Sequence, residues 1–191
     1  MELLEQLRAY IPWNEQEIRD QAELLRQLES SQDLYSRENT AAHLTASAWV
    51  VSPNRSQVLM AYHNLYDSWA WLGGHADGDR DLLAVALREV REESGLTRVQ
   101  AVSPDIYSLE ILPVAGHVKK GQYVSSHLHL NITYLLEADP EEPLRSKPDE
   151  NSRVAWFAPE EAVAASTELW FRERIYTKLN EKLDLWKKSE G

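Results

Sequence analysis

The feature that most constrains this chain is a helical turn carrying three glutamates. Glu89, Glu92 and Glu93 follow the spacing i, i+3, i+4, so an α-helix places their carboxylates on one face. At about 6 Å, with an effective dielectric of about 20 to 80, each close pair costs roughly 1 to 3 kcal/mol in repulsion. A divalent cation removes this cost because carboxylate oxygens are hard ligands for such ions. The turn therefore predicts a binding site for Mg²⁺ or Mn²⁺.

A glycine-rich stretch precedes these glutamates. Residues 73–79 read GGHADGD, and glycines let the backbone approach a phosphate group or a metal ion closely. A helix is expected over about residues 81–94, with Leu83, Leu87 and Val90 as the apolar stripe that docks on a sheet. A packed helix holds its carboxylates in place before an ion arrives. The alternative is a solvated acidic face, which the glycine loop and the spacing disfavour.

The loop and the helix together resemble the signature of the Nudix hydrolase family. That signature is a glycine, five residues, a glutamate, seven residues, and then Arg-Glu-aliphatic-x-Glu-Glu-x-Gly-aliphatic. The chain matches the first glycine at Gly74 and the whole second half from Arg88 to Leu96. It departs at Arg80, where the family has glutamate. The resemblance extends over about residues 40–188.

The resemblance implies a fold and a chemistry. The implied fold is α/β, a Nudix-type α/β/α sandwich around a mixed sheet. The implied activity is metal-dependent hydrolysis, with Mg²⁺ or Mn²⁺, of the pyrophosphate bond of a nucleoside diphosphate linked to another group. By the same resemblance Glu89 and Glu93 are direct metal ligands, and Glu92 is a further ligand or the residue that activates water. Arg88 is expected to orient a glutamate, in addition to any ordinary pairing with Glu92.

The departure at Arg80 leaves two readings open. In the family, the glutamate at this position commonly pairs with the signature arginine, whereas Arg80 would face Arg88 with like charge. We expect one of the aspartates at Asp77, Asp79 and Asp81 to replace the missing partner. The competing hypothesis is a non-catalytic Nudix-like module that binds or senses a nucleotide. A relative of the isoprenoid diphosphate isomerases is disfavoured, because that chemistry relies on a cysteine and the chain has none.

Further residues are candidates for substrate binding. In residues 127–133, HLHLNIT, strand alternation places the two histidines, Asn131 and Thr133 on one face, which could contact phosphate or sugar. A satisfied or solvent-facing polar row is the alternative. The His-x-His pair could also bind a transition metal, but a zinc site is disfavoured because no third ligand is evident. The residues assigned to the substrate are Gly74, His75, His127, His129 and Glu150, the last in a loop where some family members carry an additional catalytic acid or metal ligand.

Composition limits the partners. A net charge of −11 argues against a nucleic-acid polymer, whereas a small nucleotide is still compatible because bound metal ions reverse the local sign. The sequence shows no signal peptide and no uncharged apolar stretch of about 18 residues, so we expect a cytoplasmic protein without a membrane partner. The absence of cysteine mildly favours a reducing compartment. A homodimer is compatible with the sequence.

The chain is expected to have two parts, an N-terminal helical extension over residues 1–38 and a Nudix hydrolase domain over residues 39–191. Asn14 and Glu17 resemble a capping box that opens a helix reaching about residue 28. Its apolar stripe is expected to consist of Ile18, Ala22, Leu25 and Leu28, and to pack on the main domain or on another subunit. Strands are expected at residues 44–51, 57–62, 69–72, 106–113, 123–136 and 154–158. Helices are expected from residue 159 and over residues 168–188.

Overall fold

The computed structural model describes residues 2–30, 33–119 and 121–190 of the chain, so the predicted domain limits at residues 1 and 191 lie outside the described residues. The chain divides into two compact units. The first unit comprises Met1–Ser47, Gly73–Ala86 and Pro104–Tyr134. The second unit comprises Ala48–Leu72, Leu87–Ser103 and Leu135–Gly191.

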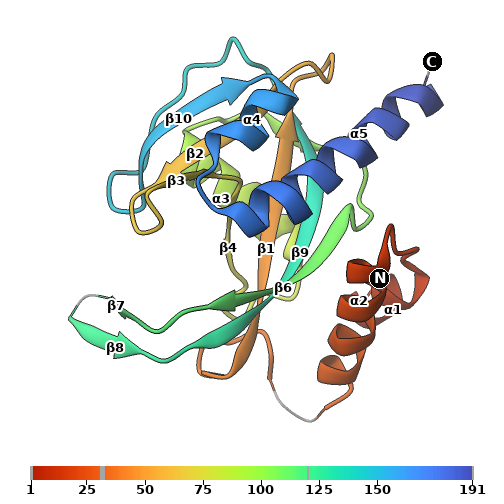
Figure 1. Cartoon of the computed structure of the whole chain (residues 1–191), viewed down its shortest axis with the longest axis vertical. Coiled ribbons are helices and arrows are strands. Elements are labelled where there is room, and N and C mark those ends of the chain that lie inside the picture. The colour runs from red at the N-terminus through yellow and green to blue at the C-terminus, as the bar shows by residue number, and fades with distance from the viewer. Residues whose placement is uncertain (1, 31–32, 120, 191) are drawn as a thin grey trace. The chain divides into compact units, whose positions relative to one another are not determined.

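Helices lie at both ends of the described chain, and a single helix, α3, interrupts the strands between them (Figure 1). The helices are α1 (Leu3–Ala9), α2 (Glu15–Leu28), α3 (Leu82–Ser94), α4 (Pro159–Ala165), the π-helical segment η1 (Phe171–Tyr176) and α5 (Thr177–Glu190). The strands are β1 (Ala42–Val51), β2 (Val58–His63), β3 (Ser68–Ala70), β4 (Leu72–His75), β5 (Val99–Ala101), β6 (Ser108–Val114), β7 (His117–Lys119), β8 (Gln122–Val124), β9 (His127–Ala138) and β10 (Asn151–Phe157). This content confirms the α/β class expected from the sequence.

One sheet contains most of the strands. Its order is β10-β2-β1-β9-β5, with β3 paired to β2, β4 to β1 and β6 to β9, while β7 and β8 form a separate pair. The strands predicted at residues 44–51 and 57–62 are present as β1 and β2, an antiparallel pair that meets at Val51 opposite Val58. β1 and β9 contribute residues to both units.

In the second unit, α4 packs on β2, β3 and β10 and also contacts α5 and η1. The predicted C-terminal helix starts in a different form from the one expected, because Phe171–Tyr176 is π-helical. Tyr176 in this segment is fully buried, and its ring stacks on Trp49 with centroids 5.4 Å apart. Its hydroxyl accepts a hydrogen bond from the backbone nitrogen of Trp71 at 3.3 Å. The π-helical segment therefore contains Tyr176, a buried side chain that is held by the Trp49 ring and by the Trp71 backbone nitrogen.

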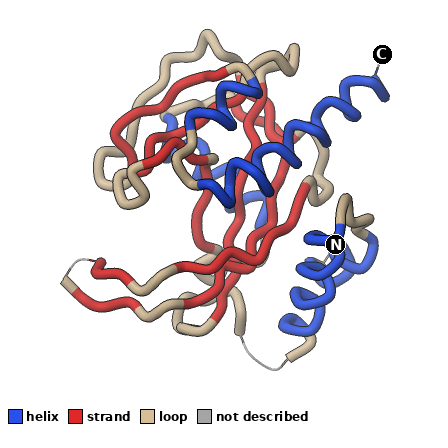
Figure 2. The backbone as a smooth tube through the Cα atoms, viewed as in Figure 1, coloured by secondary structure: helices blue, strands red, loops and turns tan. Residues whose placement is uncertain are grey.

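In the first unit, β6 and β9 form a long antiparallel pair that continues into the β7–β8 hairpin (Figure 2). The register runs from Ser108 opposite Thr133 to Val114 opposite His127. This register places the His-x-His pair near the end of the β6–β9 ladder.

The N-terminal helices are tied to β6 within the first unit. α2 packs on β6, and Asn14 caps it by accepting from the Glu17 backbone nitrogen at 3.0 Å, as predicted. The predicted apolar stripe is wrong in its first half: Ile18 is 54% exposed and Ala22 is also exposed, whereas Leu25 and Leu28 are half-buried. The fully buried side chains of α2 are those of Glu17 and Leu24. The face of α2 that carries Glu17 packs inward because three hydrogen-bond donors surround this carboxylate.

Those donors come from three parts of the first unit. Glu17 accepts from the Tyr10 hydroxyl at 2.6 Å, the Trp13 backbone nitrogen at 2.7 Å and the Ser108 hydroxyl at 2.8 Å. Burial and the adjacent Glu17 carboxylate raise the pKa of Tyr10, so this phenol stays a donor at physiological pH. The buried carboxylate thus connects α1, α2 and β6.

We expect Glu17→Ala to lower the free energy of unfolding by about 1 to 3 kcal/mol, because it leaves buried donors without an acceptor. Urea denaturation followed by circular dichroism measures this change. Glu15→Ala, at an exposed position two residues earlier on α2, is the matched control and should shift stability by less than about 0.5 kcal/mol. Equal effects of the two substitutions would contradict the role assigned to Glu17.

Candidate active site

The signature helix α3 begins and ends as its sequence dictates. The Asp81 carboxylate accepts from the Ala84 backbone nitrogen at 3.0 Å and so caps the first turn. Gly95 follows the last turn with φ of +75°, a conformation that glycine adopts without strain. The predicted stripe is packed in part, because Val90 is buried while Leu83 and Leu87 are half-buried. Leu82, Val85 and Ala86 are buried as well, so the packed face is broader than the predicted stripe.

The packing of α3 gives the three carboxylates, which belong to the second unit, different degrees of exposure. Glu93 falls on the packed side and is only 7% exposed. The Glu89 side chain is 15% exposed and that of Glu92 is 47% exposed. Burial, together with the nearby Glu92 charge, raises the pKa of Glu89. The turn therefore combines two enclosed carboxylates with one that reaches solvent.

Lys147 joins two predicted site residues, and sequence reasoning missed it. Its Nζ lies 3.2 Å from Glu92 Oε2 and 3.0 Å from Glu150 Oε2. Burial alone would lower the pKa of Lys147, but hydrogen bonds to Glu150 and Glu92 outweigh it and raise the pKa above its usual range. Glu150 is thereby brought to the signature helix, as its assignment to the site requires. A lone lysine in an acidic loop was the only signal in the sequence.

The loop that carries Lys147 and Glu150 is hydrogen-bonded near both its start and its finish to residues in or just after the last turn of α3. At the start, the Glu142 carboxylate accepts from the backbone nitrogen and the hydroxyl of Thr97 at 2.7 and 2.6 Å. These hydrogen bonds lower the pKa of Glu142. At the end, the Asn151 amide donates to the Glu93 backbone oxygen at 3.1 Å.

Arg88 and the residues around Arg80 have identifiable partners. Arg88 Nη2 lies 3.6 Å from Glu89 Oε1, which fits a role in orienting that glutamate. Within the first unit, Arg37 holds Asp77 with two hydrogen bonds of 2.6 and 2.7 Å. The Arg80 guanidinium lies over the Tyr35 ring, 4.7 Å from its centroid. The expectation that an aspartate replaces the family's glutamate as the partner of Arg88 stays a prediction.

The glycine loop in the first unit needs its first glycine for space. A Cβ added to Gly73 would lie 2.5 Å from the Ala46 backbone oxygen and 2.6 Å from Ser47 Cα. Backbone atoms cannot move aside as a side chain can, so this position excludes every side chain. Gly74 follows in β4, the strand paired with β1. The close approach fixes the path of the chain into His75.

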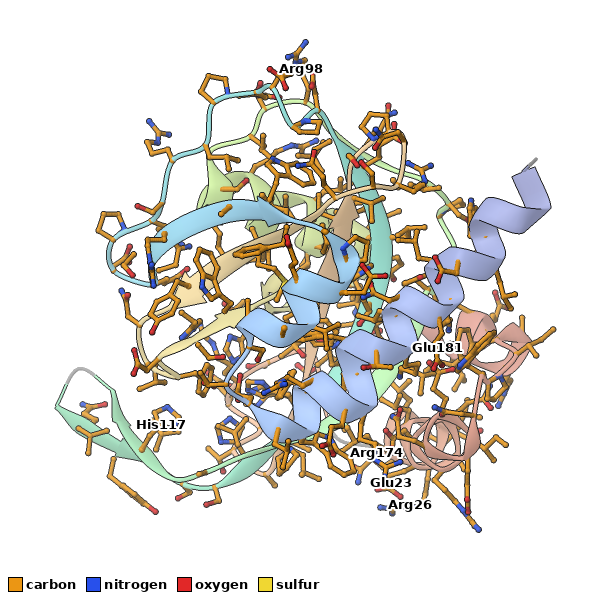
Figure 3. The ribbon with its side chains drawn as sticks, turned by 45° about the horizontal axis from the view of Figure 1, so that its top comes forward. Glu23, Arg26, Arg98, His117, Arg174 and Glu181 are labelled. Carbon is orange, nitrogen blue, oxygen red and sulfur yellow. The ribbon has the colours of Figure 1, made fainter. Side chains whose placement is uncertain are left out.

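The predicted histidines gather in the first unit with a fourth that sequence reasoning did not include. His75, His127 and His129 surround the buried His43, whose ring centroid lies 4.9 to 5.2 Å from theirs. Burial and the nearby His75 and His43 rings lower the pKa of His129 to about 2. His117, labelled in Figure 3, lies farther out, with its ring centroid 6.3 Å from that of His127.

The other half of the predicted polar row is not available to a ligand. Asn131 and Thr133 are buried, and both donate to Glu110 Oε2, at 3.0 and 2.9 Å. Thr45 and Ser47 donate to the Asn131 side-chain oxygen at 2.9 and 2.8 Å. These polar side chains satisfy one another's hydrogen bonds inside the first unit. For Asn131 and Thr133 this is the satisfied polar row that was the alternative to substrate binding.

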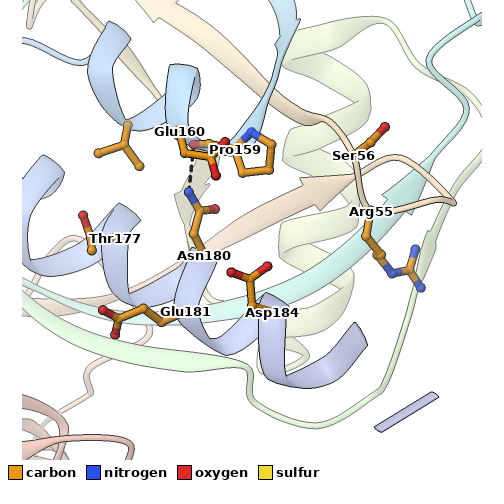
Figure 4. Close-up of a pocket in the computed structure, with 9 residues that line it drawn as sticks. Arg55, Ser56, Pro159, Glu160, Thr177, Asn180, Glu181 and Asp184 are labelled. Carbon is orange, nitrogen blue, oxygen red and sulfur yellow. Dashed lines mark hydrogen bonds between the residues drawn. The ribbon is translucent and has the colours of Figure 1, made fainter. Parts of the chain in front are cut away.

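A pocket of about 390 Å³ in the second unit lies elsewhere (Figure 4). It is formed by α4, α5 and the turn before β2, and the Asn180 amide donates across it to the Pro159 backbone oxygen at 2.7 Å. Its charged lining residues are Arg55, Glu160, Glu181 and Asp184. Three acids around one arginine disfavour a phosphate, and none of the predicted site residues line this pocket.

A glycine-containing loop leading into a helix with three clustered carboxylates, in an α/β fold, defines the Nudix class of proteins. The NUDIX domain model matches residues 41–179, and the chain therefore belongs to the Nudix family. Within the described residues, no helix is long and apolar enough to cross a membrane.

Solved structures agree on the fold. An Ap4A hydrolase from C. elegans is 16% identical with a TM-score of 0.56, over 76% of this chain and 98% of that one. The dihydroneopterin triphosphate pyrophosphohydrolase of E. coli is 16% identical with a TM-score of 0.52, over 72% and 95%. A Nudix family hydrolase from Clostridium perfringens is 22% identical with a TM-score of 0.50, over 75% and 97%. No curated protein matches the sequence of the chain. These similarities confirm the Nudix-type fold, with helices α1 and α2 preceding the domain.

Proposed function

We propose that the chain hydrolyses the pyrophosphate bond of a nucleoside diphosphate linked to another group, with Mg²⁺ or Mn²⁺ as its cofactor. The observation that carries this proposal is the convergence of four carboxylates in the second unit. Glu89, Glu92 and Glu93 share a turn of α3, and Lys147 connects Glu92 to Glu150 through contacts of 3.2 and 3.0 Å. The products would be a nucleoside monophosphate and a phosphorylated remainder.

The donor set fits a hard divalent cation. Glu89 and Glu93 are held by a packed helix, and the raised pKa of Glu89 reflects burial and the adjacent Glu92 carboxylate. A bound dication would offset both the cost of burying the Glu89 charge and its repulsion by Glu92. Such an ion, held by Glu89, Glu92 and Glu93, would lower the pKa of bound water and neutralise charge on the pyrophosphate oxygens.

Three further roles in the proposed reaction would belong to Glu92, Arg88 and Glu150. Glu92 is the most exposed of the three glutamates, so it is placed to accept a proton from attacking water. Arg88 lies beside Glu89 and keeps that carboxylate oriented. Glu150 would enter the site as a further acid when Lys147 releases it.

A substrate panel tests the proposal. Purified full-length protein is incubated with Mg²⁺ or Mn²⁺ and ADP-ribose, CDP-alcohols, nucleotide sugars, dinucleoside polyphosphates or oxidised nucleoside triphosphates. We expect turnover of at least one compound, with a nucleoside monophosphate among the products and complete loss of activity after chelation. Protein that is folded and binds Mn²⁺ but turns over none of these compounds would overturn the proposal.

One observation favours the second candidate, a non-catalytic nucleotide-binding module. Arg80 stands where the family has glutamate, and its guanidinium lies over Tyr35. Calorimetry with the same panel separates the candidates, because binding without turnover in Mg²⁺ or Mn²⁺ indicates a module. If Arg80 is what impairs activity, Arg80→Glu should then confer turnover.

Lys147 leads to a prediction about metal affinity. Its ammonium places one positive charge between two of the four carboxylates, so Lys147→Gln should tighten Mn²⁺ binding about fivefold, corresponding to about 1 kcal/mol of Coulomb energy in a high dielectric. Titration calorimetry in the absence of substrate measures this change. Lys182→Gln, which makes the same charge change on α5, should leave the affinity unaltered. Weaker Mn²⁺ binding by the Lys147 variant would contradict this role of Lys147.

A further inference from the structure

Apart from His63, every histidine of the chain lies in the first unit, and three of them converge closely. The ring centroids of His43, His75 and His129 lie 4.9 to 5.2 Å apart. One ring nitrogen from each lies within 4.8 Å of the other two. These three side chains have no part in the carboxylate chemistry described above. Their convergence is the strongest unassigned feature of the described residues.

His43 is oriented as a metal ligand would be. Its Nδ1 lies 3.0 Å from the Asn39 backbone oxygen, to which it donates, so the lone pair of the neutral ring is on Nε2. That Nε2 atom is buried, and no hydrogen-bond donor reaches it from the part of the chain that the structure describes. Metal-binding histidines usually show this arrangement, because a backbone carbonyl fixes the tautomer and the ring. A metal ion would satisfy this buried acceptor.

A fourth histidine, His127, lies next to His43 and His129 and presents another ring nitrogen. Its Nδ1 lies 2.8 Å from the Ser125 backbone oxygen, so its lone pair is also on Nε2. The Nε2 atoms of His127 and His129 are 3.2 Å apart. Two nitrogens on a tetrahedral zinc ion, at about 2.0 to 2.1 Å from the metal, are separated by about 3.3 Å. This pair therefore has the spacing of either a hydrogen bond or two ligands of one ion.

The supporting elements suit a preformed site. His43 lies on β1, His75 ends β4, and His129 lies on β9, so each ligand comes from a strand of the same sheet. The ligand atoms lie within 4.8 Å of one another, and an ion bound by all three would draw them to about 3.3 Å. His75 also follows Gly73 and Gly74 directly, so an ion bound there would fix the end of the glycine loop.

We propose that His43, His75 and His129 bind a divalent transition-metal ion of the zinc class, with His127 beside them. Imidazole nitrogens prefer Zn²⁺, Ni²⁺, Co²⁺ and Cu²⁺, whereas Mg²⁺ and Mn²⁺ prefer oxygen ligands. The chain would thus hold two kinds of ion on two sets of residues that have no member in common. The histidine site does not depend on the proposed hydrolase activity.

The test uses untagged full-length protein with Zn²⁺, and with Co²⁺ as a spectroscopic probe. Glu93→Gln serves as the background, because it weakens the carboxylate site and leaves the histidines intact. We expect one equivalent of Zn²⁺ by calorimetry, visible Co²⁺ bands typical of nitrogen ligation, and a rise in melting temperature with Zn²⁺ that the same concentration of Mg²⁺ does not produce.

Substitutions locate the ion. His75→Gln and His129→Gln, at half-buried positions, should each weaken Zn²⁺ binding at least about tenfold, whereas His63→Gln in the second unit should leave it unchanged. Circular dichroism confirms that each variant is folded, and the buried His43 is left intact. No Zn²⁺ uptake by folded protein, or equal losses in His63→Gln and His75→Gln, would overturn the proposal. Loss of turnover in Glu93→Gln with unchanged Zn²⁺ uptake would support two separate sites.

Discussion

Glu93→Gln will lower the turnover number by at least about 100-fold, equivalent to about 2.7 kcal/mol of transition-state stabilisation. Glutamine keeps the shape of the side chain but loses the charge that a hard cation requires. Glu93 is the most enclosed of the three glutamates, so neighbouring solvent cannot replace the lost ligand oxygen. Steady-state kinetics on the substrate identified by the panel, at saturating Mg²⁺, measures the loss.

The same substitution should leave the fold intact. Without metal, removing one of three clustered negative charges relieves repulsion within α3, so the melting temperature should stay equal or rise. Glu141→Gln is the control, because it makes the same chemical change at an exposed position in the second unit. Wild-type turnover in Glu93→Gln would show that the metal is held elsewhere. A large fall in melting temperature would instead assign Glu93 a structural role.

Gly73→Ala will reduce the free energy of unfolding by about 3 kcal/mol or more. The new methyl group would lie 2.5 Å from a backbone oxygen and 2.6 Å from a backbone Cα, both in β1, so the strands must separate. Because Gly73 lies in β4, the strand directly before the loop that leads to the signature helix, turnover should fall together with stability. Chemical denaturation and kinetics on the same preparation measure both effects.

Gly78 offers a matched comparison in the same loop. A Cβ there meets no atom within 4 Å, although φ is +92°. Gly78→Asn therefore adds backbone strain without a clash, and asparagine tolerates positive φ better than most residues, so we expect a loss of about 1 kcal/mol. A loss at Gly73 no larger than that at Gly78 would contradict the steric requirement for glycine at Gly73.

Features fixed by neighbours in the sequence were predicted well. The Asn14 cap, the hairpin turn before β2, the helix after Asp81 and the glycine that ends it all depend on residues within a few positions of one another. The Nudix fold followed from the signature for the same reason, since its spacing is local. Short-range chemistry of this kind is readable from one sequence.

Features that depend on distant residues were not predicted. Glu17 is buried because Ser108, far along the chain, supplies a donor, so a stripe drawn from apolar residues alone was wrong for the first half of α2. His43 precedes the His-x-His pair by more than 80 residues, and only the sheet brings these histidines together. Lys147 becomes part of the candidate site only because its loop returns to α3.

The two-ended attachment of the loop after β9 has an evolutionary consequence. Glu142 fastens the loop to Thr97, Asn151 fastens it to the Glu93 backbone oxygen, and between them the Arg145 backbone nitrogen donates to the Ser94 backbone oxygen at 2.7 Å. Because these attachments set the backbone course of the loop, its exposed side chains can be exchanged while Lys147 and Glu150 stay beside α3. Descendants of this chain can in this way acquire new selectivity while the acid trio stays unaltered.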